Sequence, residues 1–150
     1  MPQSLAKIIL HIVFSTKGRH PLIFEELQPS LQSYLAGACR AIGCEAYRVG
    51  GTVDHVHIAC QLSRTVTVSK LVEEIKKSSS QWMKDQDHRC LEFAWQNGYG
   101  AFSIGQSQLD ALLHYIDAQQ EHHRMRSFKD ELSELLERYK VECDPRYLWD

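Results

Sequence analysis

The sequence predicts an α+β fold in which an antiparallel sheet is backed by helices. Short runs rich in β-branched and aromatic residues, such as residues 7–14 (KIILHIVF), are typical of buried strands. Longer segments with apolar residues at every third or fourth position, such as residues 25–42, indicate amphipathic helices. The chain has 150 residues, of which 43% are hydrophobic, which is enough for one core and too little for two ordinary domains. We therefore expect a single domain over residues 1–150.

The elements follow from these patterns in order. The strand at 7–14 ends before Gly18 and Pro21, and the helix at 25–42 contains Pro29, which must lie in the first turn, where no hydrogen bond is lost. The patterns then predict strands at residues 45–49 and 54–62 joined around Gly50 and Gly51, a helix at 67–84, and a bent strand or hairpin at 93–104.

The resulting order is strand, helix, strand, strand, helix, strand, which is that of the split βαβ, or ferredoxin-like, fold. Two further helices are expected after it. Ser107 is a candidate N-cap for a helix that ends near residue 123, and Ser127 for one that ends near residue 139. The tail at 144–150 is expected to be held by its apolar residues, Tyr147, Leu148 and Trp149.

Composition excludes several classes of protein. No run of about 18 apolar residues is present, and the N-terminus lacks a signal-peptide pattern, so we expect a cytoplasmic protein without a membrane partner. Five cysteines without a CxxC pair fit free thiols in a reducing compartment. The net charge of −2 argues against a protein that coats nucleic acid indiscriminately. Nucleic acid would have to bind a local patch.

Residues 54–60 (DHVHIAC) contain the chemistry around which the chain is organised. In a strand, side chains two positions apart share a face, so His55 and His57 project together while Val56 points to the opposite face. Two imidazoles on a rigid strand form half of a metal site. Asp54 is a candidate ligand or supporting partner, but its position before His55 favours a turn or cap role.

The helix at 107–123 offers a candidate for the other half. Tyr115 and Gln119 lie about 100° from the centre of its apolar stripe, on a shared exposed flank. A tyrosine there is usually only a rim residue of an amphipathic helix. Near a bound cation, however, its phenol could attack phosphorus, and the amide oxygen of Gln119 could be a third ligand.

The chemistry of such a pair is direct. Free tyrosine has a pKa of about 10, so roughly one molecule in a thousand is phenolate at neutral pH. A divalent metal that binds the phosphate would withdraw charge from phosphorus and neutralise the transition state. Attack on a DNA phosphodiester would leave a phosphotyrosine and a free 3′ hydroxyl. Imidazoles suit zinc or manganese, whereas phosphoryl transfer usually uses magnesium or manganese.

Several blocks of the sequence resemble one known family. The strand His55-Val56-His57 is similar to the histidine-hydrophobe-histidine (HUH) motif, and residues 114–123 (HYIDAQQEHH) resemble the tyrosine helix of single-tyrosine transposases of the insertion-sequence 200/605 type, the IS200-like transposases. Residues 11–17, 95–103 and 144–150 resemble further segments of that family. The matching blocks occur in the family's order over nearly the whole chain.

This resemblance implies specific roles. Tyr115 would be the nucleophile, and His55, His57 and Gln119 would bind Mg²⁺ or Mn²⁺. It also implies a homodimer in which the tyrosine helix of one subunit serves the histidines of the other. The substrate would be single-stranded DNA whose element ends are marked by hairpins.

Other charged residues have weaker interpretations. The candidate phosphate contacts are Lys17, Arg19, Lys76 and Lys77, for which surface solvation is the alternative. His122 and His123 are expected to be solvated at a helix end. The remaining histidines, which are expected to be structural or exposed, are His11, His20, His88 and His114.

Two alternatives share the same fold. One is a non-catalytic or host-adopted nucleic-acid-binding protein, because this fold also serves RNA-binding domains whose sheet aromatics stack bases. Here the sheet offers histidines where stacking aromatics would be expected. The other is a related HUH nickase of replication initiation, which shares the chemistry and differs in its DNA.

Overall fold

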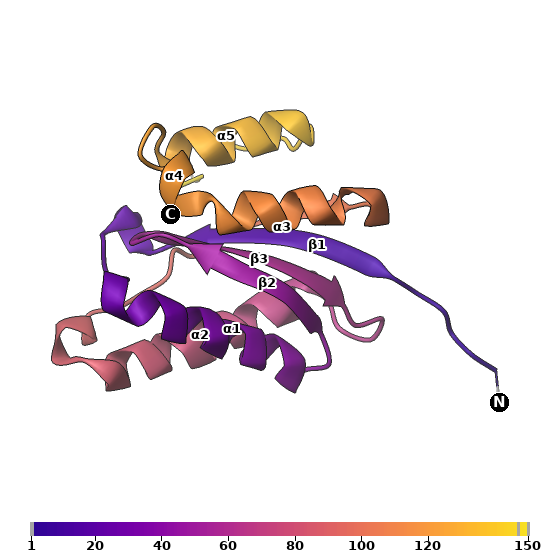
Figure 1. Ribbon diagram of the computed structural model, residues 1–150, viewed down its shortest axis with the longest axis horizontal. Helices are drawn as coiled ribbons and strands as arrows, with labels where there is room; N and C mark the ends of the chain where they lie inside the picture. Colours follow the sequence, from indigo (N-terminus) through magenta and orange to yellow (C-terminus); the bar gives the residue numbers. More distant parts are fainter. Residues whose placement is uncertain (1, 147, 150) are drawn as a thin grey trace.

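A four-stranded antiparallel sheet forms the centre of the computed structural model, which describes residues 2–146 and 148–149. The strand order is β2-β3-β1-β4, with helices on both faces (Figure 1). The strands are β1 (Ile8–Ser15), β2 (Glu45–Gly51), β3 (His55–Leu62) and β4 (Gly100–Ile104). The α-helices are α1 (Gln28–Ala41), α2 (Val68–Gln86), α3 (Leu109–Asp117), α4 (Gln119–His122) and α5 (Phe128–Arg138). The predicted α+β, ferredoxin-like class is confirmed.

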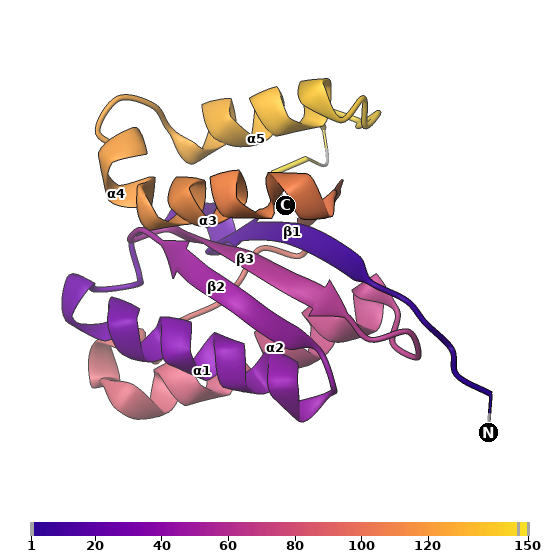
Figure 2. The same cartoon turned by 45° about the vertical axis from the view of Figure 1, so that its right-hand side comes forward.

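The two faces of the sheet have different characters. Alternate residues of β1 and β3, among them Ile12, Phe14 and Ile58, pack against α1 and α2 in the main hydrophobic core. The side chains between them face α3, α4 and α5, which lie on the opposite side in both views (Figures 1 and 2). In that register His57 pairs with Val13, so the histidines lie in the middle of the sheet rather than at its edge.

The turn after β2 is shorter than the sequence predicted. The strand continues through Gly50 and Gly51, and the turn comprises residues 52–54. Gly50 lies directly beneath α3, since a Cβ added there would be 2.8 Å from the carbonyl oxygen of Ile116. Gly50 therefore allows α3 to approach the sheet closely and does not form the chain reversal.

The predicted strand or hairpin at 93–104 was only partly right. Its second half is β4, but its first half is a loop that makes one isolated bridge, between Thr16 and Trp95. Trp95 and Phe93 are buried in the main core, which takes this segment out of the sheet. The ammonium of Lys76 holds the turn by donating to the carbonyl oxygens of Gln96 (2.8 Å) and Gly98 (2.6 Å).

The predicted helix at 107–123 is interrupted. A 3₁₀ turn at Gln106–Gln108 precedes α3, and the Gln108 side chain accepts a hydrogen bond from the backbone of Gly105, so Ser107 is not the N-cap. Ala118 separates α3 from α4. Hydrogen bonds of helical spacing continue across this junction, from the backbone of Ala118 to His114 and from His123 to Gln119.

The C-terminal elements agree better with the sequence. Ser127 caps α5 through a hydrogen bond from the backbone of Asp130, and Pro29 lies in the first turn of α1, as predicted. Leu148 and Trp149 pack against the smaller cluster beneath α5, whereas Tyr147 lies outside the described residues. Within the described chain, every helix is too short or too polar to span a bilayer.

Candidate functional site

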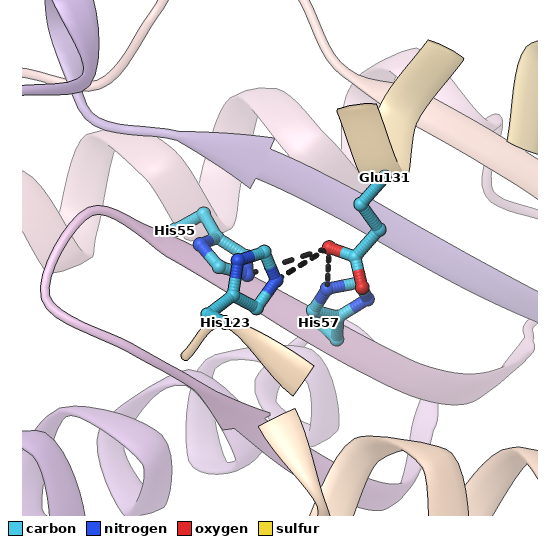
Figure 3. Close-up of side chains that lie close together, drawn as sticks. All are labelled: His55, His57, His123 and Glu131. Atoms are coloured by element: carbon cyan, nitrogen blue, oxygen red, sulfur yellow. Dashed lines mark hydrogen bonds and ion pairs between the residues drawn. The ribbon is translucent and has the colours of Figure 1, made fainter. Parts of the chain in front are cut away.

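The two histidines of β3 lie at the bottom of an enclosed site between the sheet and α3, α4 and α5. Both side chains are completely buried. The Nε2 atoms of His55 and His57 point toward the same carboxylate, that of Glu131 from α5, together with Nε2 of His123 (Figure 3). The ligand atoms of these four residues lie within 4.8 Å of one another.

Glu131 is the centre of this cluster. Its Oε1 accepts from Nε2 of His57 at 2.9 Å and from Nε2 of His123 at 3.0 Å, and it lies 3.5 Å from Nε2 of His55. Its other oxygen, Oε2, accepts a hydrogen bond from the hydroxyl of Tyr115 and another from the amide of Gln119 at 3.1 Å. One carboxylate thus connects the histidines to the tyrosine.

The far nitrogen of each strand histidine is also held. Nδ1 of His55 lies 2.7 Å from Oδ1 of Asp54 and 3.0 Å from the hydroxyl of Thr52. Nδ1 of His57 lies 2.7 Å from Nε2 of His11, which projects from the neighbouring strand. Such contacts fix the orientation of imidazoles and are usual around metal ligands. Asp54 therefore positions His55, in addition to bonding Thr52 in the turn.

Tyr115 and Gln119 lie on the same flank of the helix, as predicted, but α5 covers that flank. Gln119 is 1% exposed, and its Oε1 lies 3.0 Å from Nε2 of His55. Tyr115 is half-buried, with its ring centroid 5.7 Å from that of His57. The sequence suggested an exposed flank because it could not show that α5 packs over it.

Burial and the carboxylate control the charges. Burial lowers the pKa of His57 to about 4 against the opposing effect of Glu131, and burial together with His57 lowers the pKa of His11 to about 3. Burial alone would raise the pKa of Glu131, but hydrogen bonds from His123 and His57 hold it well below its usual range. Burial and Glu131 raise the pKa of Tyr115. At neutral pH the site therefore contains a carboxylate, neutral His11 and His57, and a protonated phenol.

This set of donors fits a divalent cation. Three imidazole nitrogens and a carboxylate oxygen suit zinc or manganese better than magnesium, which prefers oxygen. Nε2 of His55 lies 3.0 Å from Oε1 of Gln119, so this amide oxygen is near enough to share a cation with the imidazole. The residues that would hold it are His55, His57, His123 and Glu131, with Gln119 beside His55.

Sequence reasoning missed three members of the site. His123 contacts Glu131 and is not a solvated residue of a helix end; it lies one turn after Gln119 and shares its flank, a spacing that could have identified it. His11 is buried against His57, although only a structural role was expected. Glu131 was overlooked among the other acidic residues of its helix, although its spacing from Phe128 and Leu135 places it with the buried residues of α5. By contrast His20, His88 and His114 are exposed.

The candidate phosphate contacts lie in different surroundings. The ammonium of Lys76 donates hydrogen bonds to the backbone carbonyl oxygens of residues 96–98 and so stabilises that loop. Burial lowers the pKa of Lys76 to about 8. Lys17 and Lys77 are exposed, and each lines a pocket that does not include His123. Arg19 lines a pocket that reaches His123. Of the four, Arg19 alone is placed beside the site by these contacts.

Comparisons with known proteins bear on the family and on the fold of the chain. A family profile described as "Transposase IS200 like" matches residues 4–119, more than half of the chain. A comparison with curated proteins gave no match. Glu131 and His123 lie beyond the matched residues.

Two solved structures have a similar fold. One is a Deinococcus radiodurans R1 protein provisionally described as a transposase, with a TM-score of 0.61 and 19% identity, covering 79% of this chain and 98% of that one. The other is a REP-associated tyrosine transposase bound to a REP hairpin, with a TM-score of 0.59 and 16% identity, covering 82% of this chain and 73% of that one.

Proposed function

Because the chain belongs to the IS200-like transposase family, we propose that it cleaves and rejoins single-stranded DNA through a covalent bond between Tyr115 and a 5′ phosphate. Its site would use a divalent cation, Mn²⁺ or Mg²⁺, held by the histidines of β3. The substrate would be DNA whose ends are marked by hairpins, and the REP-associated tyrosine transposase of similar fold is itself bound to a REP hairpin.

One observation supports this proposal above the others. The hydroxyl of Tyr115 and the imidazole of His57 bind opposite oxygens of the same buried carboxylate. A single side chain, that of Glu131, therefore separates the phenol from the nitrogens that would bind the cation. A tyrosine with a merely structural role would not need a place beside four potential metal ligands.

The residues divide the reaction between them. The bound cation would polarise the scissile phosphate and neutralise charge that develops on its oxygens. Tyr115 attacks phosphorus once the site has opened, and its phenolic proton passes to water, because the carboxylate of Glu131, whose pKa is held well below its usual range, is a weak base. The bond from phosphorus to the 3′ oxygen breaks, and that oxygen takes up a proton to become the free 3′ hydroxyl. Before DNA binds, Gln119 and His123 hold the carboxylate of Glu131 in place.

The site must open before DNA can enter. His55, His57 and Glu131 are almost fully buried, and Glu131 itself occupies the space in which a phosphate oxygen would approach the cation. We infer that the segment carrying Glu131 moves aside when DNA binds.

A homodimer with exchanged tyrosine helices remains a prediction from the family resemblance. In the present structure Tyr115 lies beside the histidines of its own chain. An exchange between two copies would have to reproduce that contact.

The test is formation of a covalent adduct. Single-stranded DNA carrying an element end, incubated with the protein and Mn²⁺, should give a species that migrates as protein plus DNA on a denaturing gel. Tyr115→Phe should abolish it, while the matched control Tyr47→Phe, on β2 and bonded to Gln61, should leave it unchanged. Hairpin binding without any adduct, and insensitive to EDTA, would instead favour a binding protein without catalysis.

A further inference from the structure

A basic pocket borders the histidine cluster at His123. Its volume is about 490 Å³, which falls in the range of pockets that hold small ligands. Four cationic side chains line it: Arg19, Arg124, Arg126 and Lys129. The chain as a whole carries a net charge of −2, so this concentration of positive charge is local.

We propose that this pocket binds a backbone phosphate of single-stranded DNA, next to the phosphate that reacts. The proposal deepens the function proposed above and rests on it. His123 belongs both to the pocket and to the cluster, and Asp54, also in the pocket, holds His55. A strand whose scissile phosphate reached the cluster would have its neighbouring nucleotide here.

Arg19 gives a specific reason to expect an anion. Its Nη1 atom is buried and has no hydrogen-bond partner among the described residues. An unpaired buried donor costs free energy, which a phosphate oxygen would recover. The guanidinium lies 5.4 Å from the centroid of the Trp149 ring, a contact that restricts the side chain of Arg19. Arginine in such a fixed position is well suited to phosphate.

The other cationic side chains of the pocket differ in whether a carboxylate of the protein neutralises them. Arg126 is paired with Glu134 at 2.6 Å, so part of its charge is neutralised within the protein. Arg124 and Lys129 are exposed, and the ammonium of Lys129 lies 5.1 Å from the centroid of the Trp149 ring. Asp54 is the carboxylate of the pocket, and its contact with His55 directs it inward. Arg124, Lys129 and Arg19 therefore remain for the phosphate.

Val53 gives the pocket an apolar edge. It lies on the turn between β2 and β3 and is 40% exposed, beside the buried ring of Phe128 in the same lining. A sugar or base can contact this edge while the phosphate faces the cations. No base edge is read by such contacts, so the pocket should accept any sequence.

The salt dependence of DNA binding tests the pocket apart from the chemistry. Fluorescence anisotropy of a labelled single-stranded oligonucleotide is measured in EDTA with Tyr115→Phe as the parent, so that neither metal nor cleavage contributes. The double substitution Arg124→Gln and Lys129→Gln should weaken binding about tenfold or more and reduce the slope of log K against log salt by roughly 0.7 for each phosphate that is no longer neutralised. Arg19→Gln should weaken binding as well, but because the pocket holds one phosphate, the three substitutions together should reduce the slope by no more than about 0.7.

A matched control separates a pocket from general charge. Arg40→Gln with Arg64→Gln also removes two cations, but Arg40 lies at the end of α1 and Arg64 in the loop before α2, and neither lines the pocket. This pair should leave the slope unchanged. An equal decrease in both double variants, or no decrease in the pocket variant, would overturn the proposal.

The outcomes also distinguish this proposal from the proposed function. Pocket-dependent binding by a protein that forms no adduct would support the pocket and contradict the transposase chemistry. An adduct that forms while the pocket variants bind with the parent slope would support the chemistry and overturn the pocket. Absence of any binding by the parent would contradict both.

Discussion

At the scale of single residues, Glu131 decides what the site can do. Its two oxygens connect His57 and His123 on one side to Tyr115 and Gln119 on the other. A buried carboxylate with several charge-assisted or neutral hydrogen bonds is stable as the anion, which agrees with its lowered pKa. The same negative charge would attract a divalent cation to the histidines.

Replacement of this carboxylate should weaken metal binding. We expect Glu131→Gln to lower the affinity for Mn²⁺ by about 100-fold or more, because losing even a residue that only orients a ligand costs about 10- to 100-fold. Isothermal titration calorimetry measures the affinity, and the metal-induced rise in Tm gives a second readout.

The control for that experiment lies one turn further along α5. Glu134→Gln removes an exposed carboxylate that pairs with Arg126 and Arg138, away from the cluster. It should bind Mn²⁺ as the parent does. Unchanged affinity in Glu131→Gln would show that this residue is not a ligand.

The sequence could predict some of these residues and not others. His55 and His57 followed from strand alternation, and Tyr115 and Gln119 from one turn of a helix, because both relations are local. Glu131 reaches the site only through the docking of α5 on the sheet, a tertiary contact that no spacing records. His123 lies one turn after Gln119, so the same local relation was available for it, but it was expected to be solvated at the helix end.

At the scale of elements, the position of α3 on the sheet determines where Tyr115 lies. The helix rests on β2 at Gly50, where the carbonyl oxygen and Cγ2 of Ile116 would be within 3 Å of an added Cβ. At its end, Asp117 forms an ion pair with Arg48 of the same strand. Ile116 is the neighbour of Tyr115, so a shift of α3 would move the phenol.

A methyl group at Gly50 should therefore lower the stability of the protein and slow its chemistry. We expect Gly50→Ala to destabilise the protein by about 1–3 kcal/mol, the usual cost of overpacking, and to slow adduct formation strongly because α3 must move away from β2. Chemical denaturation measures the first effect and single-turnover adduct formation the second.

Gly37→Ala is the matched control. Gly37 lies within α1 with nothing within 4 Å of an added Cβ, so alanine there should stabilise the helix by roughly 0.5–1 kcal/mol and leave adduct formation unaltered. Normal adduct formation by Gly50→Ala would contradict the tight placement of α3.

Elements were predicted well where pattern and packing agree. The strands β1 and β3 and the helices α1, α2 and α5 followed their periodicity and caps to within a few residues. The first half of the strand or hairpin predicted at 93–104 was wrong. Phe93 and Trp95 have a high β propensity, but they are buried in the main core and do not form a strand. The prediction of a turn at Gly50 was wrong because this glycine allows the close approach of α3, a contact that the local sequence does not show.

At the scale of the whole molecule, the sheet separates an apolar core from a buried polar one. The α1 and α2 side holds most of the buried hydrophobic residues. The other side buries several imidazoles and a carboxylate, whose charges depend on pH. The stability of the molecule should follow those charges.

Acid should therefore destabilise the fold before most carboxylates titrate. The pKa values of His11 and His57 are lowered from 6.5 to about 3 and about 4, so their contribution to stability is complete above pH 6.5 and is lost as the pH falls toward 4. The lowered pKa of Glu131 acts in the same direction at more acidic pH. Tm measured in EDTA should fall across this window.

A variant that removes one of these groups checks the cause. His11→Phe should flatten the fall in Tm because one buried imidazole no longer titrates, whereas His114→Gln, at an exposed position, should not. A Tm that stays constant from pH 6.5 to 4 would contradict the assignment of neutral buried histidines.

Whether Tyr115 is the nucleophile is decided by identifying the residue that becomes bound to DNA. The adduct formed with single-stranded DNA and Mn²⁺ is digested with nuclease and trypsin, and the modified peptide is sequenced by mass spectrometry. We expect a nucleotide 5′ phosphate on the phenolic oxygen of Tyr115, in the peptide between Arg89 and Arg124 that also contains Tyr99. A phosphate on Tyr99 or on any residue other than Tyr115 would contradict the proposed chemistry.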